Sequence, residues 1–141
     1  MTSYSVYLNF LGTCRKAFDR YKSIFGGEFE SVSTFGEMPP QDGMPIPEEM
    51  KDMIMHISLK VNDKMSFFGS DTGGQWAPDF SVGTNMSVSL DIDTREEADR
   101  LFDELSKDGK VTMPMNETFW GSYFGLCTDE FGVQWMFSVA I

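Results

Sequence analysis

A chain of 141 residues with 41% hydrophobic and 23% charged residues is typical of one folded domain, and this composition excludes a disordered or fibrous protein. Its net charge of −11 disfavours nucleic acids and anionic membranes as partners, because both are negatively charged. No apolar run approaches the roughly 18 residues needed to span a bilayer, and the first residues lack the pattern of a secretion signal, so we expect a cytoplasmic protein.

The first half of the chain begins with a predicted strand and helix. Residues 5–10 alternate between apolar and polar side chains, which is typical of a half-buried strand. A helix follows, because apolar residues recur at the i, i+3, i+4, i+7 spacing of one helical stripe: Cys14, Ala17, Phe18 and Tyr21. Gly26 and Gly27 then predict the end of this helix.

The same strand and helix pattern recurs later in the chain. Val88 follows Val6 by 82 positions in the strand, and Ala98 follows Cys14 by 84 positions in the helix. Extended segments follow each helix, with predicted hairpin turns at residues 62–63 and 129–132. Both halves therefore predict the order βαβββ, with repeats at residues 3–71 and 84–140 inside a single domain of residues 1–141.

A four-stranded sheet covered by one helix leaves its second face open. We therefore predict an α+β fold, in which two βαβββ modules form a curved eight-stranded mixed sheet with a concave cleft and the helices outside. The proline-rich segment 36–52 is predicted to be an exposed loop. Trp76, in a second irregular segment, is expected to contact the cleft or another subunit.

The segment "ETFWGSYFGLCTDEFGVQWMF", residues 117–137, concentrates aromatic side chains in the last hairpins. Alternate side chains there either line the cleft or pack against the helix. Four of them are candidates for binding a ligand, with core packing as the alternative for each: Phe119, Trp120, Tyr123 and Trp135. Cys14 and Cys127 form neither a CxxC pair nor a disulfide framework, so we expect reduced structural thiols.

Three segments resemble the PhnB-like branch of the vicinal oxygen chelate superfamily: "YLNFLGTCRKAFDRYKSIFGGE", "MHISLKVND" and "ETFWGSYFGLCTDEFGVQWMFSV". This superfamily also holds glyoxalase I, extradiol dioxygenases, and bleomycin- and fosfomycin-resistance proteins. The resemblance covers nearly the whole chain. PhnB-like proteins are also labelled as demethylubiquinone methyltransferases, but the sequence has no Gly-rich nucleotide loop after a strand.

The resemblance implies four metal-ligand positions, one on the first and one on the last strand of each half. By strand phase and alignment these are Ser5, Ser87, Phe68 and Met136, and a shift of two residues offers Tyr7 and Ser89 instead of the serines. Neither set contains strong donors for a divalent ion. We therefore expect no metal and no other cofactor.

The polar candidates lie on the predicted strands. His56, the single histidine, is expected to face the cleft, as a structural residue or as a general base. Glu117 borders the aromatic region, where desolvation would make it an acid or base, although a solvated carboxylate is the alternative. Tyr7, Asn9, Ser87 and Asp91 are further ligand-binding candidates on the polar faces of the first strands.

Three functions remain open from the sequence. The first is a metal-free protein that binds a small aromatic or amphipathic molecule in an aromatic-lined cleft. The second is a glyoxalase-type lyase, isomerase or dioxygenase that uses a metal or the acid–base pair His56 and Glu117. The third is a dimeric interaction module. Superfamily members frequently pair, so the resemblance implies a homodimer in each case.

Overall fold

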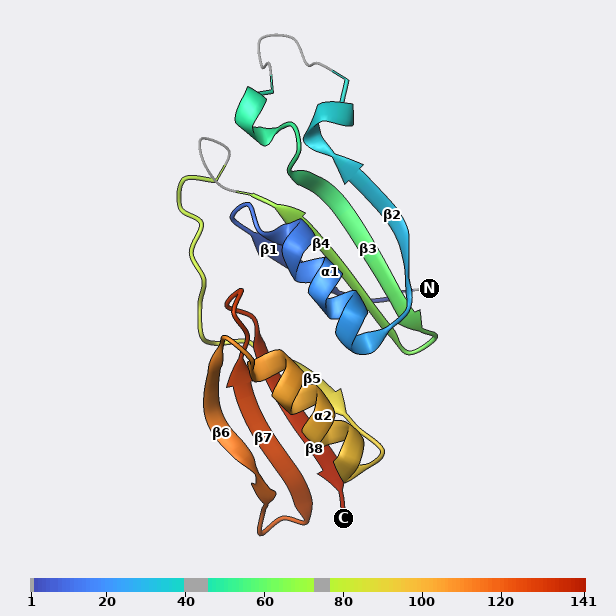
Figure 1. The fold of residues 1–141 in the computed structure, drawn as a ribbon, viewed down its shortest axis with the longest axis vertical. Coiled ribbons are helices and arrows are strands. Elements are labelled where there is room, and N and C mark those ends of the chain that lie inside the picture. Colours follow the sequence, from blue (N-terminus) through green and yellow to red (C-terminus); the bar gives the residue numbers. More distant parts are fainter. Residues whose placement is uncertain (1, 40–45, 73–76) are drawn as a thin grey trace. The chain divides into compact units, whose positions relative to one another are not determined.

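The computed structural model describes residues 2–39, 46–72 and 77–141, in two compact units, Met1–Phe80 and Ser81–Ile141 (Figure 1). Trp76 lies outside the described residues, and so do residues 40–45 of the proline-rich loop. Each unit is a four-stranded sheet with one helix on one face (Figure 1).

The first unit contains strands β1 (Val6–Phe10), β2 (Glu28–Thr34), β3 (Ile54–Asn62) and β4 (Met65–Asp71), with helix α1 (Cys14–Phe25) between β1 and β2. The strand order is β1-β4-β3-β2. β1 runs parallel to β4, and the other pairs are antiparallel. Two 3-10 turns, Phe35–Glu37 and Glu48–Met50, flank the undescribed part of the loop, and their Phe35 and Met50 side chains are buried.

The second unit repeats this topology. It contains β5 (Val88–Asp91), α2 (Arg95–Ser106), β6 (Lys110–Glu117), β7 (Ser122–Thr128) and β8 (Gln134–Ala140), in the strand order β5-β8-β7-β6. β5 runs parallel to β8, as β1 does to β4. Within the described residues, neither helix is long and apolar enough to cross a bilayer.

The α+β class and the two βαβββ modules are confirmed. Hydrogen bonding joins the described strands into two four-stranded sheets, each with two edges. The concave cleft and the action of both modules as a single domain stay predictions. The predicted strand through Trp120 is shorter than expected, because Thr118 begins a turn in which its amide donates to the Ser122 carbonyl oxygen, at 2.8 Å. Gly121 has φ +87° in this turn, where a glycine is favoured.

Each helix begins at a side chain that accepts from its backbone. The Thr94 hydroxyl accepts from the Glu97 amide at 3.2 Å and caps α2. α1 has no such cap from Thr13. Instead the buried Asp71 carboxylate, at the end of β4, accepts from the Cys14 amide and from the Ile54 amide, each at 2.9 Å. Asp71 therefore ties the first turn of α1 to β3.

The core of each unit lies between its helix and its sheet. In the first unit the Phe18 and Tyr21 rings of α1 pack against each other, and Tyr21 packs against Phe67 of β4. In the second unit Phe102 of α2 meets Phe137 of β8 edge to face, with ring centroids 5.2 Å apart. Side chains alternate along a strand, so the residues between these core positions point to the face without a helix.

Candidate functional site

The first open face is the helix-free face of the first sheet, and it carries both polar and aromatic side chains. The register pairs Tyr7 with Phe68 across β1 and β4, and Phe68 with Ser58 across β4 and β3. We define this face by residues that alternate with the core positions of the same strands: Tyr7, Asn9, His56, Ser58, Phe68 and Ser70.

His56 contacts two aromatic rings on the first open face. Its Nδ1 is 3.4 Å from the Tyr7 hydroxyl, and the two ring centroids are 5.9 Å apart. The imidazole also stacks with the Phe68 ring, with ring centroids 6.1 Å apart and an interplanar angle of 22°. Tyr7 is 48% exposed, so a molecule in solvent can reach this group. The three rings form a surface that offers both stacking and hydrogen bonding.

Polar side chains continue the first open face beside these rings. The Ser70 hydroxyl donates to the Asn9 side-chain oxygen at 3.3 Å. Ser58, next to Phe68 in the register, is only 5% exposed. The predicted candidates Tyr7, Asn9 and His56 therefore come together on one face of one sheet.

The second open face is the helix-free face of the second sheet, and it is largely apolar. One row of the register runs from Asp91 through Ser138 and Phe124 to Asn116, and the next runs from Ser89 through Met136 and Leu126 to Met113. The Ser89 hydroxyl lies 3.7 Å from the Met136 sulfur. Ser87 is exposed directly before β5, in phase with Ser89, and Asp91 is exposed at the end of β5.

Trp120 borders the second open face from the turn between β6 and β7. Its ring meets the Phe124 ring edge to face at 5.7 Å between centroids, and it meets the Phe119 ring edge to face at 5.0 Å. Trp120 is 58% exposed and Phe119 is 97% exposed. Both side chains are therefore accessible to a ligand or to another protein.

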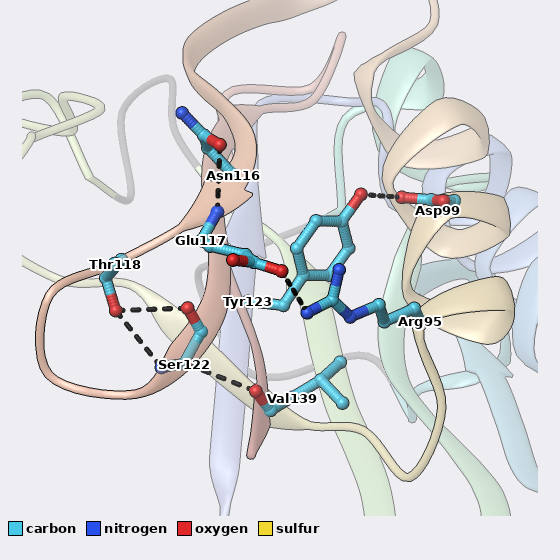
Figure 2. Close-up of polar contacts among 8 residues, drawn as sticks. All are labelled: Arg95, Asp99, Asn116, Glu117, Thr118, Ser122, Tyr123 and Val139. Atoms are coloured by element: carbon cyan, nitrogen blue, oxygen red, sulfur yellow. Dashed lines mark hydrogen bonds and ion pairs between the residues drawn. The ribbon is translucent and has the colours of Figure 1, made fainter. Parts of the chain in front are cut away.

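Glu117 and Tyr123 lie instead on the helix-covered face of the second sheet, at its edge (Figure 2). The Arg95 guanidinium of α2 donates to the Glu117 carboxylate at 2.5 Å and lies over the Tyr123 ring, 4.7 Å from its centroid. The Tyr123 hydroxyl donates to Asp99 at 2.6 Å, and this hydrogen bond raises the pKa of the phenol. These contacts attach the β6–β7 hairpin to α2.

The sequence-based role of Glu117 as a desolvated acid or base is not supported by this environment. Its side chain is 60% exposed and ion-paired, so it is the solvated carboxylate of the alternative interpretation. Tyr123 was predicted as a ligand-binding residue. Its side chain instead contributes to the contact between helix and sheet and does not lie on the open face.

Trp135 was a ligand-binding candidate with core packing as the alternative, and its burial supports the alternative. It is 0% exposed on the helix-covered face of β8, where its indole N–H donates to the buried Asp129 carboxylate at 2.9 Å. The same carboxylate accepts from the Phe131 and Val133 amides at 2.9 and 3.0 Å. Trp135 therefore belongs to the core and closes the turn before β8.

The register pairs four of the positions that the resemblance implies for metal ligands. On the open faces Phe68 pairs with Tyr7, and Met136 pairs with Ser89. A phenol with a phenyl ring, and a hydroxyl with a thioether, do not fit the ligand preferences of a hard divalent ion. In the described parts of the chain, no three His, Cys, Asp or Glu side chains are grouped to hold a metal.

Both cysteines are buried free thiols. Burial, with the nearby Asp71 carboxylate, raises the pKa of Cys14 to about 12. Burial, with Asp129, raises the pKa of Cys127 to about 12 as well. Neither thiol is suited to act as a nucleophile, which requires the thiolate.

Phe68, Phe124 and Met136 lie on the open faces, and they were not among the ligand-binding candidates predicted from the sequence. Strand alternation is the signal that could have found them, because each is an apolar residue in phase with the polar face of its strand. Alternation alone does not select them, however, since it gives no strand order.

The sequence model of the family described as 3-demethylubiquinone-9 3-methyltransferase matches residues 2–138 of this chain. The chain belongs to this family. Protein YjdN from Escherichia coli strain K12 is 35% identical over 146 residues, which cover 96% of this chain and 93% of YjdN.

Solved structures agree with this family. The crystal structure of protein PA1353 from Pseudomonas aeruginosa is 36% identical, covers 99% of this chain and 98% of its own, and has a TM-score of 0.82. The PhnB protein from Bacillus cereus is 26% identical, with coverages of 99% and 100% and a TM-score of 0.78. A glyoxalase/bleomycin resistance protein/dioxygenase family enzyme from Burkholderia phytofirmans PsJN shares the fold alone, at 16% identity, coverages of 96% and 97%, and a TM-score of 0.62. The resemblance to the PhnB-like branch of the vicinal oxygen chelate superfamily is thus confirmed.

Proposed function

We propose that this protein is a metal-free receptor that binds a small aromatic or amphipathic molecule on the open faces of its sheets. The family and the fold support a small-molecule-binding protein of the vicinal oxygen chelate superfamily. The observation that carries the finer proposal is His56 on the first open face, in contact with the rings of Tyr7 and Phe68.

This group has the composition of a site for an organic ligand. Two aromatic rings provide flat apolar area, and the imidazole, the phenol and the Asn9 amide provide directional hydrogen bonds. Among the described residues, the hydrogen-bond partner of the imidazole is the Tyr7 hydroxyl, through Nδ1, so Nε2 remains for a ligand. An aromatic molecule that stacks on these rings and hydrogen-bonds Nε2 would use both properties.

The metal-free part of the proposal depends on the donor set. The pairs Tyr7 with Phe68 and Ser89 with Met136 stand at positions that the resemblance implies for metal ligands, and they offer weak donors to a divalent ion. Elemental analysis of the purified protein tests this part. We expect less than about 0.1 equivalents of zinc, iron, nickel or manganese. A stoichiometric metal whose removal also removes ligand binding would contradict a metal-free receptor.

The family description names methyl transfer, which we do not propose for this chain. Each sheet contains a single parallel pair, β1 with β4 or β5 with β8. Nucleotide-type cofactors of open α/β enzymes bind where a mostly parallel sheet reverses its strand order, and neither described sheet has such a point.

The receptor is tested by NMR titration with a panel of aromatic compounds, because the chain contains a single histidine and its ring gives one set of signals. We expect binding compounds to shift the His56 ring signals. His56→Ala is expected to weaken binding. Tyr7→Phe distinguishes the contribution of the phenol hydroxyl to binding from that of the aromatic ring. Glu117→Gln is the control, because its carboxylate is on the helix-covered face. If every compound leaves the His56 signals unchanged, the receptor proposal fails for the first open face.

An acid–base enzyme is the second candidate, and the contact between His56 Nδ1 and the Tyr7 hydroxyl favours it. A phenol that hydrogen-bonds one nitrogen orients the imidazole, so that the other nitrogen can exchange a proton with a bound substrate. Glu117 is not part of this alternative. Turnover of a ligand found in the NMR panel, lost in His56→Ala, would replace the receptor by the enzyme.

We also propose that the chain acts as a cytoplasmic homodimer. The free thiols of Cys14 and Cys127 are typical of a reducing compartment. The exposed Phe119 and Trp120 side chains offer an apolar contact for another protein, which the interaction-module alternative would use as its main function. Light scattering measures whether the chain is a dimer. If the protein is an interaction module without a ligand, Trp120→Ala should change the measured mass and no compound of the panel should bind.

A further inference from the structure

The second open face combines one carboxylate with an apolar and aromatic floor. We infer that this face binds an organic cation, a primary or quaternary amine with an aromatic or aliphatic body, whose ammonium group pairs with Asp91 while its body lies over Ser138 and against Phe124 and Trp120. This inference rests on the proposed receptor function and specifies the chemistry of its ligand.

The Asp91 carboxylate is available for such a ligand. It is exposed at the end of β5, and it has no hydrogen bond or ion pair in the described part of the chain. The neighbouring Ser138 hydroxyl is already paired with the Ser122 hydroxyl at 2.8 Å, so it does not occupy Asp91. Within the described residues, Asp91 is therefore a charged group on the second open face that has no ion-pair partner.

The register gives the length of the ligand. Asp91 pairs with Ser138 on β8, and Ser138 pairs with Phe124 on β7, so two strand spacings separate the carboxylate from the aromatic ring. Two spacings amount to about 9.6 Å. Trp120 extends the aromatic wall beyond Phe124 at 5.7 Å between ring centroids. A ligand whose nitrogen and aromatic ring are separated by three or four carbons fits this distance.

Charge selects a cation rather than a neutral or anionic body. Among the described residues of the second open face, Lys110 is the basic one. In the strand register it pairs with Thr128, at the other end of the face from Asp91. Thr128 lies four residues from Phe124 on β7, or about 14 Å along the strand. The Asp91 end thus carries a net negative charge, and the net charge of −11 adds a field that attracts cations.

A matched series of probes tests the inference: 4-phenylbutylamine, 4-phenylbutan-1-ol and 4-phenylbutyrate, which share one body and differ in charge. Dissociation constants come from NMR titration of the full chain at low ionic strength, followed at the backbone amides of β5, β7 and β8. We expect the amine to bind about fivefold more tightly than the alcohol, the range of an exposed ion pair, and the butyrate to bind more weakly than the alcohol.

Two isosteric variants separate a specific contact from the overall charge. Asp91→Asn and Asp93→Asn each remove one negative charge, but Asp93 lies in the connection between β5 and α2 rather than on the open face. We expect Asp91→Asn to bind amine and alcohol equally, and Asp93→Asn to keep the preference. Trp120→Leu is expected to weaken the amine and the alcohol to the same extent, because it removes aromatic area. Circular dichroism verifies that the variants are folded.

The outcomes distinguish this inference from the receptor function. If the alcohol binds the second open face as tightly as the amine does, the cation preference is overturned while the receptor function stands. Equal losses of preference in Asp91→Asn and Asp93→Asn would also overturn it, because the preference would then come from the net charge. If none of the three probes shifts the amides of this face, the cation site is overturned, and the receptor function then depends on the His56 titration alone.

Discussion

Two tryptophans of the last hairpins were equal candidates in the sequence, and the same substitution in each separates a core residue from a surface residue. Trp135→Phe and Trp120→Phe both keep an aromatic ring. Trp135 is 0% exposed, whereas Trp120 is 58% exposed. We expect Trp135→Phe to lower the free energy of unfolding by about 3 kcal/mol and Trp120→Phe to lower it by less than about 0.5 kcal/mol.

The larger value has two parts. The smaller ring leaves a cavity in a packed core, which costs about 1 kcal/mol. The substitution also removes the indole N–H that donates to the buried Asp129 carboxylate at 2.9 Å, and losing a hydrogen bond to a charged group costs about 2 kcal/mol. Trp120 has no comparable burial, and phenylalanine can keep its edge-to-face contact with Phe124.

Urea unfolding followed by far-UV circular dichroism measures both variants without relying on tryptophan fluorescence. With a slope of about 1.5 kcal/mol/M, Trp135→Phe should move the midpoint by about 2 M and Trp120→Phe by less than about 0.4 M. Ligand affinity should show the reverse order, with the larger loss in Trp120→Phe. Similar midpoints for the two variants, or a loss of affinity in Trp135→Phe without a loss of stability, would refute the assignment of Trp135 to the core.

Four further predictions concern the reactivity of the thiols, the pH dependence that they cause, two glycines and the ion pair at α2. Burial raises the pKa of Cys14 and Cys127 from 9.0 to about 12, so both thiols stay protonated at pH 8. A disulfide reagent should therefore modify the native protein at least about tenfold more slowly than the urea-unfolded protein. Equal rates would contradict the burial of the thiols. The same raised pKa makes their contribution to stability complete below pH 9.0 and progressively lost up to about pH 12, so the urea midpoint should fall over that interval. Gly27→Ala should lower the free energy of unfolding by several kcal/mol more than Gly26→Ala does. Both glycines have positive φ, but a Cβ at Gly27 would lie 2.3 Å from a carbonyl oxygen, whereas one at Gly26 has open space. Equal losses of stability in denaturation would show that φ alone matters. Glu117→Gln should cost less than about 1 kcal/mol and leave ligand affinity unchanged, because its ion pair is exposed; a large loss of affinity would return Glu117 to the site.

Most of the fold could be predicted because two periods repeat along the chain. Alternation identified the strand faces, and the i, i+3, i+4, i+7 stripe identified both helices, with α1 ending at Gly26 as expected. The end of β6 was missed because "TFW" has high strand propensity, but the Thr118 side chain closes a turn on Ser122. The sequence also gave no sign that Asp71 replaces Thr13 at the start of α1, since that contact joins residues far apart in the chain.

The site was predictable on the first sheet and less so on the second. Tyr7, Asn9 and His56 share one face because alternation fixes the face of every residue on a strand. Alternation does not tell which face the helix covers, and for the aromatic hairpins this decided the outcome: Tyr123 and Trp135 are on the covered face, and Phe124 is on the open one. A residue pattern with apolar side chains on both faces contains too little contrast to make that choice.

Binding of an organic molecule to the open faces without a metal can be followed in a single NMR experiment. Protein treated with a chelator is titrated with the aromatic panel while the ring signals of His56 and the indole signal of Trp135 are followed together. We expect saturable shifts of the His56 ring, while the Trp135 indole, held by Asp129 in the core, stays in place. Binding that appears only when a divalent metal is restored, or that moves the Trp135 indole and leaves His56 unchanged, would contradict this expectation.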